Sequence, residues 1–295
     1  MIRLSVPAST TNFGSGFDAF GLALELRNEF TVKPSDVYRV TVKGYAEGIP
    51  ADETNLFIKV YKKVCRRLRV KEYPLELEQL NRVPPARGLG SSATAIVAAV
   101  ETALLLNERE LTLEEKLSLA FEFEPHPDNL LPAFTGGFTV ACTEGRELKA
   151  YARLSFPKEL KLYFLVPSYE LSTEKARAVL PRSLKLEEAV FNLQRSALLV
   201  AALAKKEFGL LREALRDRLH QPYRAPLVPG FTEALKEAEK AGALGAFLSG
   251  AGPTVCVVSQ KPVSLESVRR VLEEASGDKV ELLELKPSDE GVKVF

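Results

Sequence analysis

The sequence predicts an α+β fold with two layered lobes. Strand-like and helix-like segments follow one another in a mixed order, unlike the regular β-α-β-α alternation of a doubly wound sheet. An Ala-rich stretch after residue 93 is apolar nearly all round, which predicts a helix buried in a core. The composition changes around residues 151–160. We interpret this change as a domain junction and expect one domain at 1–155 and a second at 156–295.

The elements of the first domain follow from the spacing of its apolar residues. Alternation predicts a strand at Ile2–Val6, and a polar, Gly-containing loop follows at 7–18. Helical spacing predicts a helix at 55–68, and a capping box at Thr112 opens another that runs to Glu124. The other expected segments are an apolar run at 19–26, alternating strands at 29–42 and 73–80, a helix at 91–106, and a turn and strand within 130–142.

The second domain contains more helix-like segments. The expected helices lie at 173–180, 186–204, 209–218, 231–240 and 264–275. An apolar strand is expected at 162–166, residues 244–258 indicate two strands joined by a Gly-rich turn, and 280–285 is a last strand. These elements again predict a mixed α+β unit.

The bulk composition excludes several classes of protein. The chain has 295 residues, of which 46% are hydrophobic and 27% charged, and its formal net charge of +1 lacks the basic excess of a nucleic-acid-binding protein. Cys65, Cys142 and Cys256 are far apart, each among apolar residues, and predict buried free thiols rather than a disulfide framework. No apolar run has membrane-spanning length, and the N-terminus alternates like a strand. We therefore expect a cytoplasmic protein that binds neither nucleic acid nor membranes.

Residues 84–93, PPARGLGSSA, combine two glycines, two serines and the start of a helix. Gly88 and Gly90 allow a ligand to approach the main chain closely, and Ser91 and Ser92 are good N-cap residues that carry hydroxyls. The helix directs unpaired N–H groups and the positive end of its dipole toward the loop, which favours a phosphate there. The segment lacks the Lys of a Walker A loop and the glycine spacing of a dinucleotide fingerprint. The alternative is a loop that only introduces a buried helix.

Three Gly-containing segments, at 7–18, 84–93 and 249–254, together resemble the signature motifs of the GHMP small-molecule kinases. Features between them are similar to the homoserine kinase branch, and the resemblance covers nearly the whole chain in order. These features are Val6-Pro7-Ala8 with Asn12–Asp18, His126-Pro127-Asp128-Asn129 before Gly136-Gly137-Phe138, Ser172–Arg177, and Pro222-Tyr223-Arg224 before Pro229-Gly230-Phe231.

The resemblance implies a two-domain GHMP kinase fold. Its N-terminal domain would be a ribosomal-protein-like α+β unit that holds nucleotide in a left-handed crossover, and its C-terminal domain a ferredoxin-like α+β unit. The implied activity is ATP-dependent phosphorylation of the hydroxyl of L-homoserine, a step of threonine biosynthesis, with ATP and Mg²⁺ bound.

The resemblance also implies an ATP site. Its residues are Asn55, Pro85, Ala86, Arg87, Gly88, Leu89, Gly90, Ser91, Ser92 and Ala93. Asn55 matches the position that meets the adenine, although an Asn there is equally good chemistry as a helix N-cap.

Ser92 and Glu122 are the implied Mg²⁺ ligands and, with Asn129, form the implied catalytic set. A hydroxyl and a carboxylate suit a hard cation that keeps several waters. Glu124, two residues on, is a rival for the role of Glu122. Asn129 stands where several related kinases carry an aspartate, and an amide cannot accept a proton as a carboxylate does. We therefore expect alignment and electrostatics, without a general base, to lower the barrier.

The implied homoserine-binding residues are Asn12, Asp18, Asp128, Thr173, Arg177 and Arg224. Homoserine is a zwitterion, and the planar fork of Arg177 or Arg224 suits its carboxylate. Thr173 lies one helical turn before Arg177 and can share its face. Asp18 and Asp128 are the candidates for the ammonium, although Asp18, together with Asn12, can instead contact the hydroxyl.

The remaining features leave alternatives open. We expect His126 and His220, the two histidines, to be structural. Residues 249–254 are expected to form a tight turn near residues 84–93. A GHMP kinase for a sugar, mevalonate-like or shikimate-type alcohol is one alternative, and a non-catalytic sensor of the same fold is another. Members of the family are often dimers, which makes a homodimer a candidate state.

Overall fold

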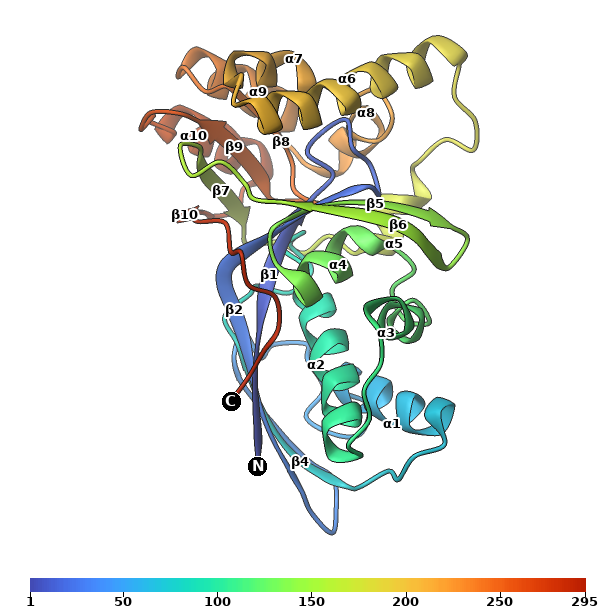
Figure 1. The fold of residues 1–295 in the computed structure, drawn as a ribbon. Helices are drawn as coiled ribbons and strands as arrows, with labels where there is room; N and C mark the ends of the chain where they lie inside the picture. The colour runs from blue at the N-terminus through green and yellow to red at the C-terminus, as the bar shows by residue number, and fades with distance from the viewer.

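The computed structural model describes residues 1–295 as two β-sheets flanked by helices, with the first lobe low and the second high in Figure 1. The first sheet has the order β11-β1-β2-β4-β3, while β5 pairs with the beginning of β2 and carries β6. Its strands are β1 (Ile2–Thr11), β2 (Phe20–Pro34), β3 (Arg39–Gly44), β4 (Leu75–Asn81), β5 (Phe138–Glu144), β6 (Glu147–Leu154) and β11 (Lys293–Val294). Its helices are α1 (Leu56–Leu68), α2 (Ser91–Leu106), α3 (Leu113–Ala120) and α4 (Pro127–Thr135).

Helix α2 is the central helix of this lobe. It packs against β1 and β2 and against α1, α3 and α4. All its residues from Ala93 to Leu104 are buried, as their apolar character predicted, and the bounds Ser91–Leu106 agree with those expected. Because the helix is held on every side, its first turn holds the preceding segment, residues 84–90 (the glycine loop), in a defined position.

The first strand is longer than the sequence indicated. We expected it to end at Val6, but β1 continues to Thr11 and pairs with β2 along its length. The register shifts between Pro7 and Ser9, so the ladder is irregular directly after the proline, which has no N–H to donate. The polar residues of this segment up to Thr11 therefore lie within a strand and not in a loop.

Besides the two-residue β11, which follows the strand expected to be the last, two further elements of the first lobe were not predicted. Residues 130–142 were expected to hold only a turn and a strand, but α4 forms first, with Pro127 in its first turn and Pro132 inside it. The helix is too short for its period to show in the sequence. Strand β6 forms a hairpin with β5 close to where the composition change suggested a junction. It was not predicted because most of its side chains are exposed, so the sequence shows no alternation of buried and exposed residues there.

The second sheet is antiparallel in the order β10-β7-β9-β8. Its strands are β7 (Lys161–Pro167), β8 (Gly245–Leu248), β9 (Val255–Ser259) and β10 (Val280–Leu285). The helices are α5 (Thr173–Ala178), α6 (Leu186–Lys205), α7 (Leu211–Ala214), α8 (Gln221–Arg224), α9 (Phe231–Lys240) and α10 (Glu266–Ser276), with 3₁₀ turns at Phe208–Leu210 and Ala225–Leu227. This is the β-α-β-β-α-β order of a ferredoxin-like unit, as the resemblance implied. The helix expected at 209–218 is instead a 3₁₀ turn followed by α7, and the short α8 was not predicted.

The two lobes share an apolar cluster. Phe13, from the loop after β1, stacks on Phe247 of β8 with ring centroids 4.7 Å apart and meets Phe138 of β5 edge-on at 5.2 Å. The chain also returns after β10, so that β11 pairs with β1 (Figure 1). A division at 155/156 thus separates the two sheets apart from β11, and the boundary itself stays a prediction. None of the helices is both long and apolar enough to cross a membrane.

Candidate active site

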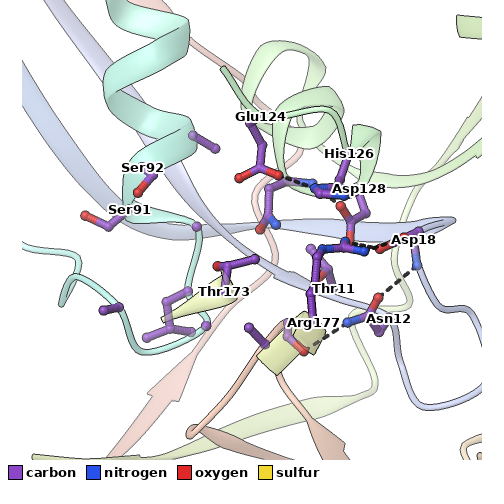
Figure 2. Close-up of a pocket in the computed structure, with 18 of the residues that line it drawn as sticks. Thr11, Asn12, Asp18, Ser91, Ser92, Glu124, His126, Asp128, Thr173 and Arg177 are labelled. Atoms are coloured by element: carbon purple, nitrogen blue, oxygen red, sulfur yellow. Dashed lines mark hydrogen bonds and ion pairs between the residues drawn. The ribbon is translucent and has the colours of Figure 1, made fainter. Parts of the chain in front are cut away.

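A cleft of about 660 Å³, counted with its open mouth, lies between the two lobes. It is lined by residues of β1, the glycine loop, α2, α4, α5, α8 and the turn before β9. Figure 2 shows the side chains converging on it. The lining residues are Thr11, Asn12, Asp18, Ala86, Gly88, Leu89, Gly90, Ser91, Ser92, Ala93, Glu124, His126, Asp128, Asn129, Thr173, Arg177, Arg224, Gly250 and Ala251. The cleft therefore joins all three Gly-containing segments.

The glycine loop exposes a row of backbone donors at one end of the cleft. The amides from Gly88 to Ala93 donate to no acceptor within the protein. Gly88 and Gly90 have φ of +74° and +72°, and a Cβ would lie 2.1 Å from the Ser249 carbonyl oxygen and 2.2 Å from Ser9 Oγ respectively. Only glycine fits at these two positions, and the result is a concave set of N–H groups at the positive end of α2. Such a set suits an anion of several oxygens.

Three residues of the expected ATP set, Asn55, Pro85 and Arg87, lie outside the cleft lining. Arg87 directs its guanidinium into the second lobe, where it donates to the carbonyls of Pro167 and Ser168 and to the carboxylate of Glu170. It also donates to the carbonyl of Pro85 at 2.6 Å. Arg87 therefore joins the loop to the end of β7, and each nitrogen of its guanidinium already donates to a protein acceptor.

Asn55 caps α1 and does not line the cleft. Its Oδ1 accepts from the Phe57 amide at 2.8 Å, and its Nδ2 donates to the Pro50 carbonyl at 2.9 Å and to Gln79 Oε1 at 3.2 Å. Both N–H groups are thus satisfied, and only 1% of the residue is exposed. The N-cap alternative describes what this side chain does here, and contact with adenine stays a prediction.

The turn at 249–254 connects the two ends of the cleft. The Ser249 hydroxyl donates to the Gly88 carbonyl at 2.7 Å, which confirms that this turn packs on the glycine loop. The carbonyl of Gly250 accepts from Asn12 Nδ2 at 3.0 Å and from Arg224 Nη1 at 2.9 Å. One turn thus orients both the loop that offers amides and the side chains that carry charge.

The charged end of the cleft contains two arginines and two aspartates. Arg177 pairs with Asp18 through two hydrogen bonds of 3.1 and 2.6 Å, and both side chains remain about one third exposed. Arg224 is only 1% exposed. Burial, followed by the charge of Arg177, lowers the pKa of the Arg224 guanidinium to about 10.

Asp128 is the second carboxyl group at this end. It is buried in the first turn of α4, and burial, together with the nearby charge of Asp18, raises the pKa of its carboxyl to about 7. Asn12 takes part indirectly, because its Oδ1 accepts from the Asp18 amide at 3.0 Å and so shapes the loop that carries Asp18. Thr173 lines the cleft one turn before Arg177, as expected.

The position of the acidic residue near Ser92 corrects one expectation. Glu122 is turned toward α1, where it pairs with Lys63 and Arg67, and it does not line the cleft. Glu124 lines the cleft instead and contacts His126 Nδ1 (Figure 2). Helix α3 ends at Ala120, earlier than predicted, and the chain turns over residues 121–123, so that Glu122 and Glu124 lie on different sides of this turn.

Ser91, Ser92 and Asn129 lie beside the glycine loop and differ in whether their polar groups have partners in the protein. Ser91 donates to the Val83 carbonyl at 3.2 Å, whereas the exposed Ser92 hydroxyl has no partner in the protein. Asn129 accepts from Ser9 Oγ at 2.9 Å, and this bond orients its amide beside the loop. A hydroxyl, a carboxylate and an amide therefore stand around the space in front of α2.

Known protein families and related sequences agree with this geometry. The family model described as GHMP kinases N terminal domain matches residues 55–137, and the model described as GHMP kinases C terminal matches residues 199–278. The homoserine kinase of Aquifex aeolicus is 56% identical over the full length of both chains, and that of Thermus thermophilus is 43% identical over 88% of this chain and 87% of its own. The chain belongs to the GHMP kinases. Within them it belongs to the homoserine kinase family.

Solved structures support the same placement. The homoserine kinase of Cytophaga hutchinsonii superposes with a TM-score of 0.86 at 28% identity and covers 100% of this chain and 97% of its own. A mevalonate kinase superposes with a TM-score of 0.67 at 14% identity, which shows a shared fold only. The expected two-domain GHMP kinase fold is therefore confirmed.

Some residues of this GHMP kinase site were not singled out from the sequence. Thr11 lines the cleft although only Asn12 and Asp18 of the segment 7–18 were expected to bind a ligand. His126 and Gly250 were noted but given no place in the binding set, although both line the cleft. His126 and Glu124 are close in sequence to Asp128, which was the only indication that they lie near the site. Only the path of the chain before α4 shows that their side chains line the cleft.

Proposed function

We propose that this chain transfers the γ-phosphoryl group of ATP to the hydroxyl of L-homoserine and yields O-phospho-L-homoserine and ADP, a step toward threonine. The observation that carries the proposal is a single cleft with free backbone amides at one end and paired acidic and basic side chains at the other. The first end suits a triphosphate and the second a zwitterion. The homoserine kinases at 56% and 43% identity support the same substrate.

The amides from Gly88 to Ala93 are the proposed cradle of the phosphates. They act together with the dipole of α2, and they need no reorganisation because α2 is buried on all sides. Their role is to hold the triphosphate so that its terminal phosphorus faces the charged end. Alignment of this kind is the main demand of phosphoryl transfer.

Arg177 and Arg224 are the proposed partners of the substrate carboxylate, and Asp18 and Asp128 those of the ammonium. In the structure Arg177 and Asp18 neutralise each other. A zwitterion supplies both opposite charges at once, so it can replace this pair without leaving a charge unpaired. A ligand with only one of the two charges cannot do so.

The residues also fit a divalent cation. Ser92 and Glu124 offer a hydroxyl and a carboxylate on either side of the space before α2, and both lack a competing cation from Lys or Arg. Hard cations prefer such oxygen donors and share them with phosphate. Mg²⁺ held there would neutralise the developing charge on the phosphate oxygens.

Asn129 is the proposed aligning residue for the hydroxyl. Its Oδ1 is engaged by Ser9, which leaves its Nδ2 to donate toward the reacting groups. The hydroxyl oxygen would attack the γ-phosphorus as the bond to the bridging oxygen breaks, and the hydroxyl proton would leave to a phosphate oxygen or water. No side chain is required as a base, and replacement of Asn129 by Ala should lower kcat.

The test is an ADP-release assay with a panel of alcohols. L-homoserine should be the preferred acceptor, while 4-hydroxybutanoate, which lacks the ammonium, and 3-aminopropan-1-ol, which lacks the carboxylate, should react poorly. Mevalonate, shikimate and a hexose test the other acceptor classes. Phosphorylation of one of these with homoserine inert would overturn the proposal. Ligand-dependent thermal stabilisation without ADP formation would favour a sensor.

The cation ligand is tested by a matched pair of variants. We expect Glu124→Gln to lower kcat by tenfold or more and to raise the Mg²⁺ concentration needed for half-maximal rate, because it removes a charged ligand. Glu122→Gln should stay within about twofold of the parent, since Glu122 forms only exposed ion pairs. Rates measured across a MgCl₂ series at constant ATP distinguish the two carboxylates, and the reverse order would return the role to Glu122.

A cytoplasmic location and a homodimeric state stay predictions from the sequence.

A further inference from the structure

The guanidinium of Arg224 is held by three groups of the protein. Its Nε donates to the Ala176 carbonyl at 3.1 Å, and its Nη1 donates to the Gly250 carbonyl at 2.9 Å and to His220 Nδ1 at 3.3 Å. Its Nη2 makes no hydrogen bond within the protein, and Arg224 lines the cleft. The protein therefore engages three of the five N–H donors and leaves the Nη2 pair for a ligand.

His220 is completely buried and has a partner at each ring nitrogen. Nε2 lies 2.9 Å from the Gly14 carbonyl oxygen, which can only accept, so Nε2 carries the proton. Nδ1 is then unprotonated and accepts from Arg224, which can only donate. In the opposite tautomer the unprotonated Nε2 would face the Gly14 carbonyl oxygen and the protonated Nδ1 would face the N–H group of Arg224. Neither contact could be a hydrogen bond, so the neighbours select the tautomer protonated at Nε2.

The charge of the ring is also controlled. Burial, ahead of the opposing charge of Asp217, lowers the pKa of His220 to about 4. The ring is thus neutral near pH 7, where a protonated ring would add a third cation beside Arg177 and Arg224. Phe17 packs against all three side chains. The centre of its ring lies 5.0 Å from that of the His220 ring, 5.4 Å from the guanidinium carbon of Arg177 and 5.1 Å from that of Arg224.

The backbone of His220 is fixed as well. Both oxygens of the buried Asp217 carboxylate accept bonds, from the amides of Leu219, His220 and Gln221 and from Asn192 Nδ2. Helix α8 has only four residues and would not be stable alone. Asp217 therefore sets the start of α8 and places His220 one turn before Arg224.

We propose that His220 is a positioning residue for substrate binding: its unprotonated Nδ1 holds Arg224 in the orientation that directs Nη2 toward the substrate carboxylate. This inference rests on the proposed function, because it gives Arg224 the carboxylate of the amino acid as its ligand. His220 itself touches neither substrate nor nucleotide.

Two substitutions separate the two ring nitrogens. His220→Asn keeps an acceptor near the position of Nδ1 and removes the donor to Gly14, whereas His220→Gln keeps a donor near Nε2 and removes the acceptor for Arg224. We expect His220→Gln to raise the KM for homoserine about tenfold, with the KM for ATP unchanged within about twofold, because one bond to a charged group is lost. His220→Asn should raise the KM for homoserine clearly less. Thermal unfolding of both variants measures the purely structural effect, which we expect to be similar.

Equal KM values for homoserine in both variants, or a larger defect in His220→Asn, would overturn the proposal. So would an equal rise in the KM for ATP. If the parent enzyme does not phosphorylate homoserine at all, the proposed function fails, and that result is separate from the comparison of variants.

A measurement without substitution covers the case in which a variant does not fold. The chain has two histidines, so ring ¹⁵N spectra of the intact protein contain two sets of signals, and His126→Gln identifies one. The signals of His220 should show protonated Nε2 and unprotonated Nδ1, and addition of homoserine should shift the Nδ1 resonance. A protonated Nδ1, or no shift on addition of saturating homoserine, would contradict the proposal.

Discussion

Asp128 and Asp18 are two carboxyl groups close enough to influence each other inside one cleft. Asp128 is the more buried, so its charge is the more costly, and its pKa is raised from the ordinary 3.8 to about 7. A raised pKa of a carboxyl means that the folded protein favours the neutral form, and this favourable contribution is lost as pH rises through about 7. A bound ammonium would reverse the preference, because it stabilises the carboxylate.

Homoserine binding should therefore depend on pH in a defined direction. Below about pH 7 a proton must leave Asp128 before the ammonium can pair with it, so the KM for homoserine should rise as pH falls from 8 to 6, toward tenfold per unit at the acidic end. The KM for ATP should not follow this trend. Steady-state kinetics at constant ionic strength measure both. Asp128→Asn should abolish the trend, and its persistence in that variant would assign the titration to another group.

At the scale of elements, the first turn of α2 is where sequence and structure agree most closely. Gly90 is its N-cap, with φ of +72°, and a Cβ there would lie 2.2 Å from Ser9 Oγ and 3.1 Å from Asn129 Oδ1. The glycine thus allows the helix start, Ser9 and Asn129 to share one small space. Any side chain at this position would disturb both the amides and the aligning residue.

We expect Gly90→Ala to raise the KM for ATP tenfold or more and to destabilise the fold. Gly145→Ala, in the turn between β5 and β6, is the matched control, because Gly145 also has a positive φ of +60° but its Cβ would meet nothing within 4 Å. The control should cost about 1 kcal/mol of unfolding free energy through backbone strain alone and should leave the KM for ATP unchanged. Kinetics and urea unfolding of both variants test this. A normal KM for ATP in Gly90→Ala would separate the glycine loop from nucleotide binding.

At the scale of the whole molecule, the segment from Lys286 to the C-terminus joins the second lobe to the first. The amide of Glu25 donates to the Lys286 carbonyl, and β11 completes the edge of the first sheet beside β1. Arg27 of β2 strengthens the join, since its guanidinium donates to the carbonyls of Ser5, Glu290 and Gly291. Together with the shared cluster around Phe13, this segment limits the freedom of the lobes at the cleft.

Loss of the Arg27 side chain should therefore loosen the C-terminal segment. We expect Arg27→Ala to lower the free energy of unfolding by about 2 kcal/mol, because several carbonyls lose a charged donor. Arg39→Ala is the control, since the exposed Arg39 on β3 forms no side-chain hydrogen bond or ion pair. Urea unfolding, with limited proteolysis of the C-terminus, provides the measurement. Equal stability and equal proteolysis of the two variants would show that Arg27 does not hold the segment.

The difference between what could and could not be predicted follows from the range of the interactions. The bounds of helix α2 agree with the prediction because its apolar residues and the glycines before it are local signals. Glu122 was expected in the cleft and Glu124 is there instead, because the end of α3 decides which way each side chain points. Asn55 and Arg87 were expected to contact ATP, yet their donors are satisfied by Gln79 and by the end of β7, which are close to them only after folding.

Period, composition and short motifs are local properties of the chain, and they were enough to predict the mixed α+β fold, the helix after the glycine loop and the residue types that a triphosphate and a zwitterion require. How those residues are paired depends on contacts that form only after folding. Asp18 and Arg177 are 159 positions apart and meet only because both lobes close on one cleft. His220 became informative only when Arg224, Gly14 and Phe17 surrounded it. Directional hydrogen bonds and burial depend on atoms from distant segments, and no local pattern in a chain specifies them.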